Sequence, residues 1–127
     1  MQTSETSKDE DLSDALNLVE DSIKENRYNL DAWLLKNEIL NALYNETSMR
    51  FKHHPELMLE ASQFVLDRKK NYWLAWMRYG ISLTLNSDLK EAEKAFNRAM
   101  QLAPNNFETN FYMASFLMNF KDRFDEA

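Results

Sequence analysis

The side chains that could do chemistry are few, and their spacing does not suit it. His53 and His54 are the only histidines; as chain neighbours they point in different directions, and no cysteine is present to complete a tetrahedral metal site. Asp9, Glu10 and Asp11 form a dense carboxylate run, but an exposed front end offers no environment that tunes a carboxyl group for acid catalysis. A single glycine leaves no phosphate-binding loop or nucleophile elbow. The sequence therefore predicts a protein that is not an enzyme and takes neither metal nor cofactor.

One basic cluster lies beside aromatic residues, at Arg68, Lys69 and Lys70 with Tyr72 and Trp73. It suits the C-terminal end of a helix followed by core aromatics of the next helix, where the basic charges meet the helix dipole. The alternative is a stacking surface for single-stranded nucleic acid. Phosphate affinity needs concentrated positive charge, and the chain carries a net charge of −6. We therefore expect no nucleic-acid partner.

The negative charge is concentrated at the front of the chain. The first 25 residues carry eight acidic and two basic side chains, which accounts for the whole net charge. We interpret this segment as a solvated helix face, with a docking patch for a basic partner as the alternative. No uncharged run is long enough to span a membrane and the polar N-terminus does not resemble a signal peptide, so we expect no membrane partner and a cytoplasmic location.

Helices must position all of these side chains, because one glycine and two prolines leave little scope for the tight turns of a β-fold. Apolar periodicity predicts a polar tail over 1–7 and a first helix over 8–26, with Ser7 and Glu10 as its capping box. Ser87 is expected to cap the fifth helix. Residues 45–54 break the pattern and predict a loop. The other expected helices cover 30–44, 55–69, 72–85, 88–103 and 106–120, with a seventh beginning near Asp122.

Residues 73–106 form a 34-residue unit with large apolar and small residues at fixed positions. This unit resembles the tetratricopeptide repeat (TPR), a helix–turn–helix module, and the resemblance implies a right-handed α-α superhelix of about six helices plus the start of a seventh. Two antiparallel helices approach closely only where side-chain bulk is removed, so we expect the single glycine at such a contact. The positions that carry the resemblance are Trp76, Tyr79, Gly80, Leu83, Ala92, Phe96, Ala99 and Pro104.

The flanking segments extend this resemblance over a single domain, residues 8–127. They read as a half repeat over 8–29, a divergent repeat over 30–72 with an insertion at 45–54, and an incomplete repeat over 107–127. In the divergent repeat Lys36 and Asn37 stand where the family usually has Leu-Gly. A solenoid needs a polar capping helix, and none follows residue 127. We therefore expect a fragment of a longer repeat protein, or ends that a partner or a second copy covers.

In this family the first helix of each unit lines a concave groove. The positions implied here are mostly apolar, which suits a peptide or amphipathic helix of another protein, with Arg78 orienting one acidic or polar group. The basic clamp by which some relatives grip acidic tails is absent, because Glu38 and Glu108 would repel a carboxylate. The implied groove residues are Leu34, Leu35, Glu38, Asn41, Leu74, Met77, Arg78, Ile81, Thr84, Leu85, Phe111, Tyr112, Ser115 and Met118.

Several alternatives remain open at this stage. Some groove positions, Leu34, Met77 and Phe111 among them, could be ordinary inter-helix core, and the chain itself could fill the groove. The hypothesis that we favour is a non-catalytic interaction scaffold. The small acidic chain also resembles TPR-type secretion chaperones for apolar segments of secreted proteins. A third hypothesis is an assembly module of a multi-subunit complex that makes its contacts through the repeat ends.

Overall fold

The computed structural model describes the backbone of residues 4–45 and 54–126 and the side chains of 10–45 and 54–120. This part of the chain is all-helical and contains six helices and no strand. The helices are α1 (Ser4–Glu25), α2 (Leu30–Asn45), α3 (His54–Arg68), α4 (Trp73–Leu85), α5 (Leu89–Leu102) and α6 (Phe107–Glu126). The all-α prediction is confirmed, and the expected bounds of the middle helices agree to within a residue or two.

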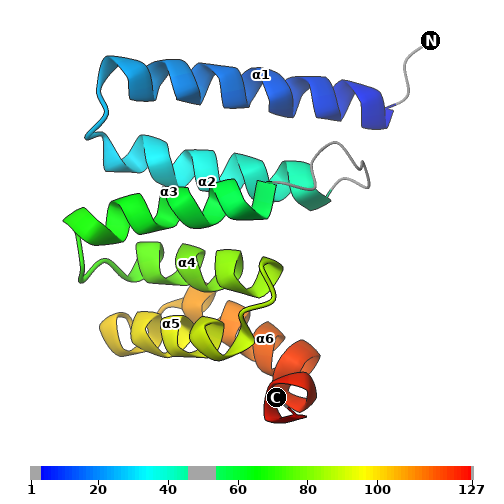
Figure 1. The fold of residues 1–127 in the computed structure, drawn as a ribbon, viewed down its shortest axis with the longest axis vertical. Coiled ribbons are helices and arrows are strands. Elements are labelled where there is room, and N and C mark those ends of the chain that lie inside the picture. Colours follow the sequence, from blue (N-terminus) through cyan, green and yellow to red (C-terminus); the bar gives the residue numbers. More distant parts are fainter. Residues whose placement is uncertain (1–3, 46–53, 127) are drawn as a thin grey trace.

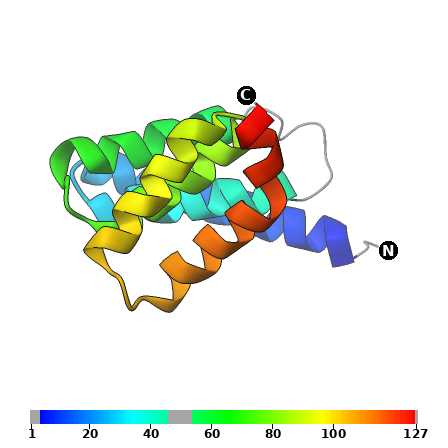
Figure 2. The same cartoon turned by 90° about the horizontal axis from the view of Figure 1, so that it is seen from below.

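Each helix packs antiparallel against the next one along the chain, and the resulting stack has α1 at one end and α6 at the other (Figure 1). Contacts between α2 and α4 and between α4 and α6 join alternate helices. Helix α6 slopes at an angle to α5 at the end of the stack opposite α1 (Figure 1), and the view from below shows its first turns beside α5 (Figure 2). The two ends of the stack are formed by different helices. Helix α1 packs chiefly against α2, and α6 packs against α5 and less extensively against α4.

A repeated hydrogen bond shows that the same helix–turn unit recurs. The Trp33 indole Nε1 donates to the carbonyl of Arg27, and the Trp76 indole donates to the carbonyl of Lys70, both at 2.7 Å and both six residues back. Asn110 Nδ2 makes the same six-residue contact with the carbonyl of Pro104 at 3.5 Å. Since the three donors lie at the start of α2, α4 and α6, these helices begin in the same register of a repeating unit.

Gly80 lies where α4 crosses α5, as expected. A Cβ built on Gly80 would lie 2.9 Å from Phe96 Cε1 and 3.0 Å from Cδ1 and Cζ of the same ring. Phe96 is buried and its ring packs at 5.5 Å from that of Phe116 on α6. The absent side chain therefore lets α5 approach α4 while one aromatic ring also reaches the following helix.

Both ends of the chain differ from the expectation. Helix α1 begins at Ser4 rather than at residue 8, so Ser7 lies inside a helix and cannot be its N-cap; residues 1–3 of the expected tail lie outside the described residues. Helix α6 runs unbroken to Glu126, so the turn expected after Phe120 and the seventh helix at Asp122 are wrong. Neither a glycine nor a proline occurs between residues 107 and 126, so the local sequence does not interrupt the helix.

The turn between α4 and α5 also differs from the expectation in its cap. Asp88, not Ser87, occupies the N-cap position of α5, and its side chain makes no capping hydrogen bond. Ser87 instead adopts a left-handed conformation with φ 64°. Asn86 ties this turn to α3 by donating from Nδ2 to the carbonyl of Pro55 at 2.8 Å. The expected 45–54 loop falls largely on residues 46–53, which lie outside the described residues.

We expect Ser87→Gly to stabilise the protein. A left-handed conformation costs a residue with a side chain about 1–2 kcal/mol, whereas glycine adopts it freely but loses more backbone entropy on folding. The net gain in the free energy of unfolding should be about 0.5–1 kcal/mol, measured by urea unfolding. Ser87→Ala is the matched control, since it removes the hydroxyl but keeps the strain. Equal stability of the two variants would contradict the strain argument.

Candidate functional site

An apolar hollow lies between α2, α4 and α6 and has a volume of about 210 Å³. Six residues of the groove implied by the repeat register line it, and Phe96 of α5 lies at its base. Three further lining residues belong to the later turns of α6. The lining residues are Asn41, Ile81, Thr84, Leu85, Phe96, Tyr112, Ser115, Phe116, Asn119 and Phe120. We refer to this hollow as the α2–α4–α6 groove.

Phe116, Asn119 and Phe120 were missed at the sequence level. The groove positions implied by the family resemblance do not include these three residues. A turn was also expected after Phe120, which would have ended the helix there. Their spacing with Tyr112 is the signal that could have found them. Residues 112, 116 and 120 follow at intervals of four, so they form one stripe along a continuous helix.

Leu34 and Met77 were expected at the groove surface, but both are core residues. Leu34 is buried against Val65 and Ala75 between α2, α3 and α4. Met77 is fully buried in the main core cluster with Leu40 and Met58. The alternative reading, ordinary inter-helix core, is therefore correct for these two residues, and neither can contact a partner in the folded protein.

The remaining implied residues are spread over other surfaces. Phe111 and Met118 lie on an outer face of α6 and are 54% and 81% exposed, and the Phe111 ring stacks on Phe107 at 6.0 Å. Leu74 is half-buried between two core clusters. Leu35 lines a separate cleft beside α1. The implied set therefore divides into a groove, a core and two further surfaces.

Arg78 is buried rather than exposed in the groove. Its side chain is 4% exposed, and Nε donates to Asn37 Oδ1 at 2.7 Å. Asn37 in turn donates from Nδ2 to the carbonyl of Met58 at 2.7 Å and to Ser82 Oγ at 2.9 Å. This polar network joins α2, α3 and α4 inside the core. Arg78 therefore holds helices together, and its expected direct contact with a ligand's acidic group is not available at the surface.

Acidic side chains surround the buried guanidinium. Burial lowers the pKa of Arg78, and the charges of Glu38, Tyr112 and Glu108 act in the opposite direction. Glu38 belongs to α2 and Glu108 to α6, and both are exposed. Nη2 of Arg78 is buried and has no hydrogen-bond partner. Neither glutamate lines the groove, whose lining residues carry no charged side chain.

The basic cluster contacts the chain's own aromatic rings. The Arg68 guanidinium lies 3.5 Å from the centroid of the Phe64 ring, and Lys69 Nζ lies 4.2 Å from that of Tyr72. Arg68 also donates from Nη1 to the carbonyl of Phe64 at 3.0 Å. This arrangement agrees with the interpretation of the cluster as the charged end of a helix. His54 begins α3, while His53 lies outside the described residues.

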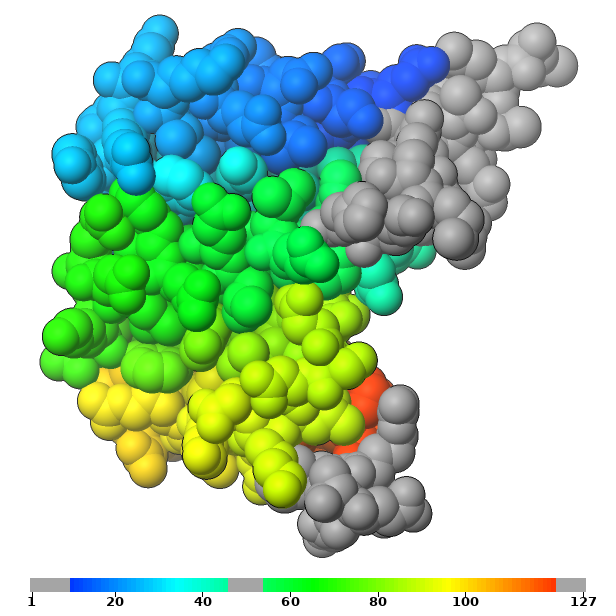
Figure 3. All heavy atoms as spheres, in the orientation of Figure 1, coloured from blue at the N-terminus to red at the C-terminus, as the bar shows by residue number. Residues whose placement is uncertain are grey.

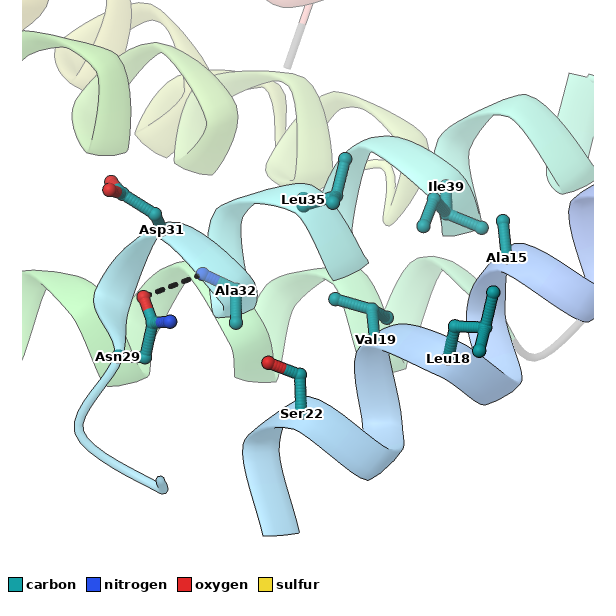
Figure 4. A pocket seen from close by; sticks show the side chains of 9 residues that line it. All are labelled: Ala15, Leu18, Val19, Ser22, Asn29, Asp31, Ala32, Leu35 and Ile39. Carbon is teal, nitrogen blue, oxygen red and sulfur yellow. Dashed lines mark hydrogen bonds between the residues drawn. The ribbon is translucent and has the colours of Figure 1, made fainter. Parts of the chain in front are cut away.

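A second apolar cleft opens between α1 and α2 and has a volume of about 550 Å³ (Figure 4). The figure shows side chains of both helices meeting across it, with Asn29 Oδ1 accepting from the backbone amide of Ala32 at its end. The lining residues are Ala15, Leu18, Val19, Ser22, Asn29, Asp31, Ala32, Leu35 and Ile39. The space-filling view shows that α1 forms one end of the stack, so this cleft belongs to the end of the molecule (Figure 3). We refer to it as the α1–α2 cleft.

No group of three or more histidine, cysteine or acidic residues that could hold a metal ion occurs within 10–45 and 54–120. None of the helices, over the residues that the structure covers, is both long and apolar enough to cross a bilayer.

No protein-family model matches the chain, and no match to its sequence is found among curated proteins. The site therefore has to be interpreted from its own residues.

Proposed function

We propose that this protein is a non-catalytic protein-binding module of the tetratricopeptide-repeat type, and that its α2–α4–α6 groove holds apolar side chains of a peptide or helix from another protein. The observation that carries the proposal is the hollow itself. Residues far apart in the sequence, among them Asn41, Ile81 and Tyr112, line one apolar depression. The recurring tryptophan and asparagine hydrogen bonds support the repeat assignment, as does the Gly80 contact.

The size and apolar chemistry of the groove suit a small number of anchoring side chains. Burying an apolar side chain stabilises a complex by roughly 1.5–3 kcal/mol, so two or three anchors give micromolar binding once association costs are subtracted. The partly buried aromatic side chains of Tyr112 and Phe120 supply contact area to a ligand. Glu38 and Glu108 are exposed on α2 and α6, two of the helices that form the groove, and they favour a ligand whose flanks are neutral or basic rather than acidic.

A variant that blocks the groove without touching the core tests this proposal. Ser115 is partly exposed and lines the groove, so Ser115→Arg places a long charged side chain in the apolar hollow. If a partner protein binds in the groove, we expect the amount captured by this variant to be at least tenfold lower than the amount captured by the wild-type chain. The measurement is quantitative mass spectrometry after affinity capture, followed by a direct titration of the enriched protein.

Ala114→Arg is the matched control. Ala114 is the adjacent residue on α6, is exposed and does not line the groove. Both variants should retain the far-UV circular dichroism and unfolding midpoint of the wild type. Equal losses with both substitutions, or no loss with Ser115→Arg, would move the binding surface away from the groove.

A further inference from the structure

Four residues of α1 line the α1–α2 cleft, and the equivalent residues of α3 and α5 are covered by another helix. Ala15, Leu18, Val19 and Ser22 of α1 precede Trp33 by 18, 15, 14 and 11 residues. The residues at the same distances before Trp76 are Met58, Ala61, Ser62 and Val65, and those before Asn110 are Ala92, Ala95, Phe96 and Ala99. These eight residues of α3 and α5 are at most 3% exposed, whereas Leu18 is 71% exposed.

In both inner units a helix covers this set of positions. On α3 the covering helix is α2, and Asn37 bonds to the carbonyl of Met58. On α5 the covering helix is α4, where Gly80 contacts the ring of Phe96. The described part of the chain places no equivalent helix on α1, which packs chiefly against α2. The α1–α2 cleft therefore has the shape of a groove for one helix.

On the α2 side of the cleft Leu35 is the exposed residue, whereas Ala32 and Ile39 are buried together with Val19 of α1. Ala32, Leu35 and Ile39 hold the register of Ala75, Arg78 and Ser82 in α4, which are all buried and face α2. Leu35 is 48% exposed. Arg78 and Ser82 form hydrogen bonds with Asn37 of α2. Leu35 and Ile39 have hydrocarbon side chains and cannot form such bonds. A helix in this cleft must therefore present an apolar residue where α2 presents Asn37.

The course of α1 indicates that the missing helix is not its neighbour in a hairpin. The turn 86–88 between α4 and α5 corresponds in register to residues 9–11, and α1 is helical throughout that stretch. A preceding antiparallel helix could not be joined there by a short turn as α4 is joined to α5. The geometry favours a helix from another protein.

The charges around the cleft define the flanks of that helix. Asp14, Asp21 and Glu25 are exposed on α1, three or four residues from Leu18 or Ser22, and Asp31 lines the cleft from α2. Two lysines near these helices are already paired with acidic residues: Lys24 lies 4.0 Å from Asp21, and Lys36 of α2 lies 3.8 Å from Glu20 of α1. A second copy offering its own acidic α1 would be repelled, while a helix with lysine or arginine beside its apolar stripe would be attracted.

We propose that the α1–α2 cleft binds a basic amphipathic helix of a partner protein, seated on α1 and α2 as α2 is seated on α3 and α4. This site is distinct from the α2–α4–α6 groove and does not depend on the function proposed for it. The apolar stripe of the bound helix has the spacing i, i+3, i+4 and i+7, and it contacts Leu18 and Leu35.

A designed peptide tests the proposal directly. The probe is a fluorescein-labelled, capped 16-residue helix with leucine and alanine at i, i+3, i+4 and i+7 and lysine beside the stripe; its partner probe carries glutamate in place of lysine. We expect fluorescence anisotropy to give micromolar binding of the lysine probe to the full chain. The glutamate probe should bind at least tenfold more weakly at low salt, and the difference should shrink in 0.5 M salt because exposed charges are screened.

Substitutions in the cleft locate the binding. Leu18→Glu and Leu35→Glu should each weaken binding of the lysine probe at least tenfold while the unfolding midpoint stays unchanged, because both side chains are exposed. Leu57→Glu, at an apolar residue of α3 that is 40% exposed, is the control and should bind as the wild type does. Ser115→Arg should also leave binding unchanged, which separates this site from the groove.

Two results would overturn the proposal. Binding of the lysine probe that neither cleft variant weakens would place the helix elsewhere. Sedimentation showing that the wild-type chain self-associates and that Leu18→Glu disperses it would assign the cleft to a second copy instead.

Discussion

Replacing Asn37 with leucine is expected to lower the free energy of unfolding by about 3 kcal/mol, because it leaves the buried Arg78 Nε without its hydrogen-bond acceptor. Asn37 is fully buried, and its Oδ1 accepts the hydrogen bond from Arg78 Nε at 2.7 Å. Leucine has the same branched shape and the same number of side-chain heavy atoms, so the substitution creates no cavity and removes the polar contacts. Urea unfolding followed by circular dichroism measures it.

The double variant Asn37→Leu with Arg78→Met provides the sharper comparison. Replacing both members of a buried polar pair by apolar residues of similar size is often neutral, whereas removing one member leaves an uncompensated charge. We expect the double variant to recover more than half of the loss caused by Asn37→Leu. Asn97→Ala, on an exposed position of α5, is the control and should change stability by less than about 0.5 kcal/mol. Additive losses in the double variant would show that the two residues act independently.

This network marks the limit of what the sequence could predict. Asn37 stands out as a departure from the small residue expected at its position, but its partners lie 21 to 45 residues away along the chain. A helix periodicity assigns a residue to a face; it does not say which polar atom of another helix lies opposite. Arg78 therefore has the right position for the groove, yet its side chain is used inside the core.

The ends of helices were harder to predict than their register. The spacing from Trp33 to Trp76 and Asn110 fixes how the units repeat, and it assigned six lining residues to the α2–α4–α6 groove. The stop after Phe120 was wrong because the expectation came from the family pattern, while the local sequence of α6 contains no helix breaker. Leu34 and Met77 were misplaced for a different reason. Neighbouring helices cover these positions, and the sequence of one helix does not show how closely its neighbours approach.

Gly80 is the position where sequence and structure agree most directly, and Gly80→Val is expected to lower the free energy of unfolding by about 3 kcal/mol. An added Cβ alone would lie within 3.0 Å of three ring atoms of Phe96, and valine adds two methyl groups that point into the same ring. The ring cannot turn away freely, because it is buried and also packs against Phe116. The gain in helix propensity from replacing glycine, at most about 1 kcal/mol, offsets only part of this loss.

Ala114→Val is the matched control for this prediction, since Ala114 holds the register of Gly80 in α6 and is exposed. There the added methyl groups meet no covering helix, so the change should stay within about 0.5 kcal/mol. Combining Gly80→Ala with Phe96→Leu should cost less than the sum of the two single losses, because the smaller side chain vacates the space that the new Cβ requires. If Gly80→Val were as stable as Ala114→Val, α4 and α5 could separate at no cost, and the close crossing would not be what sets the spacing of the repeat.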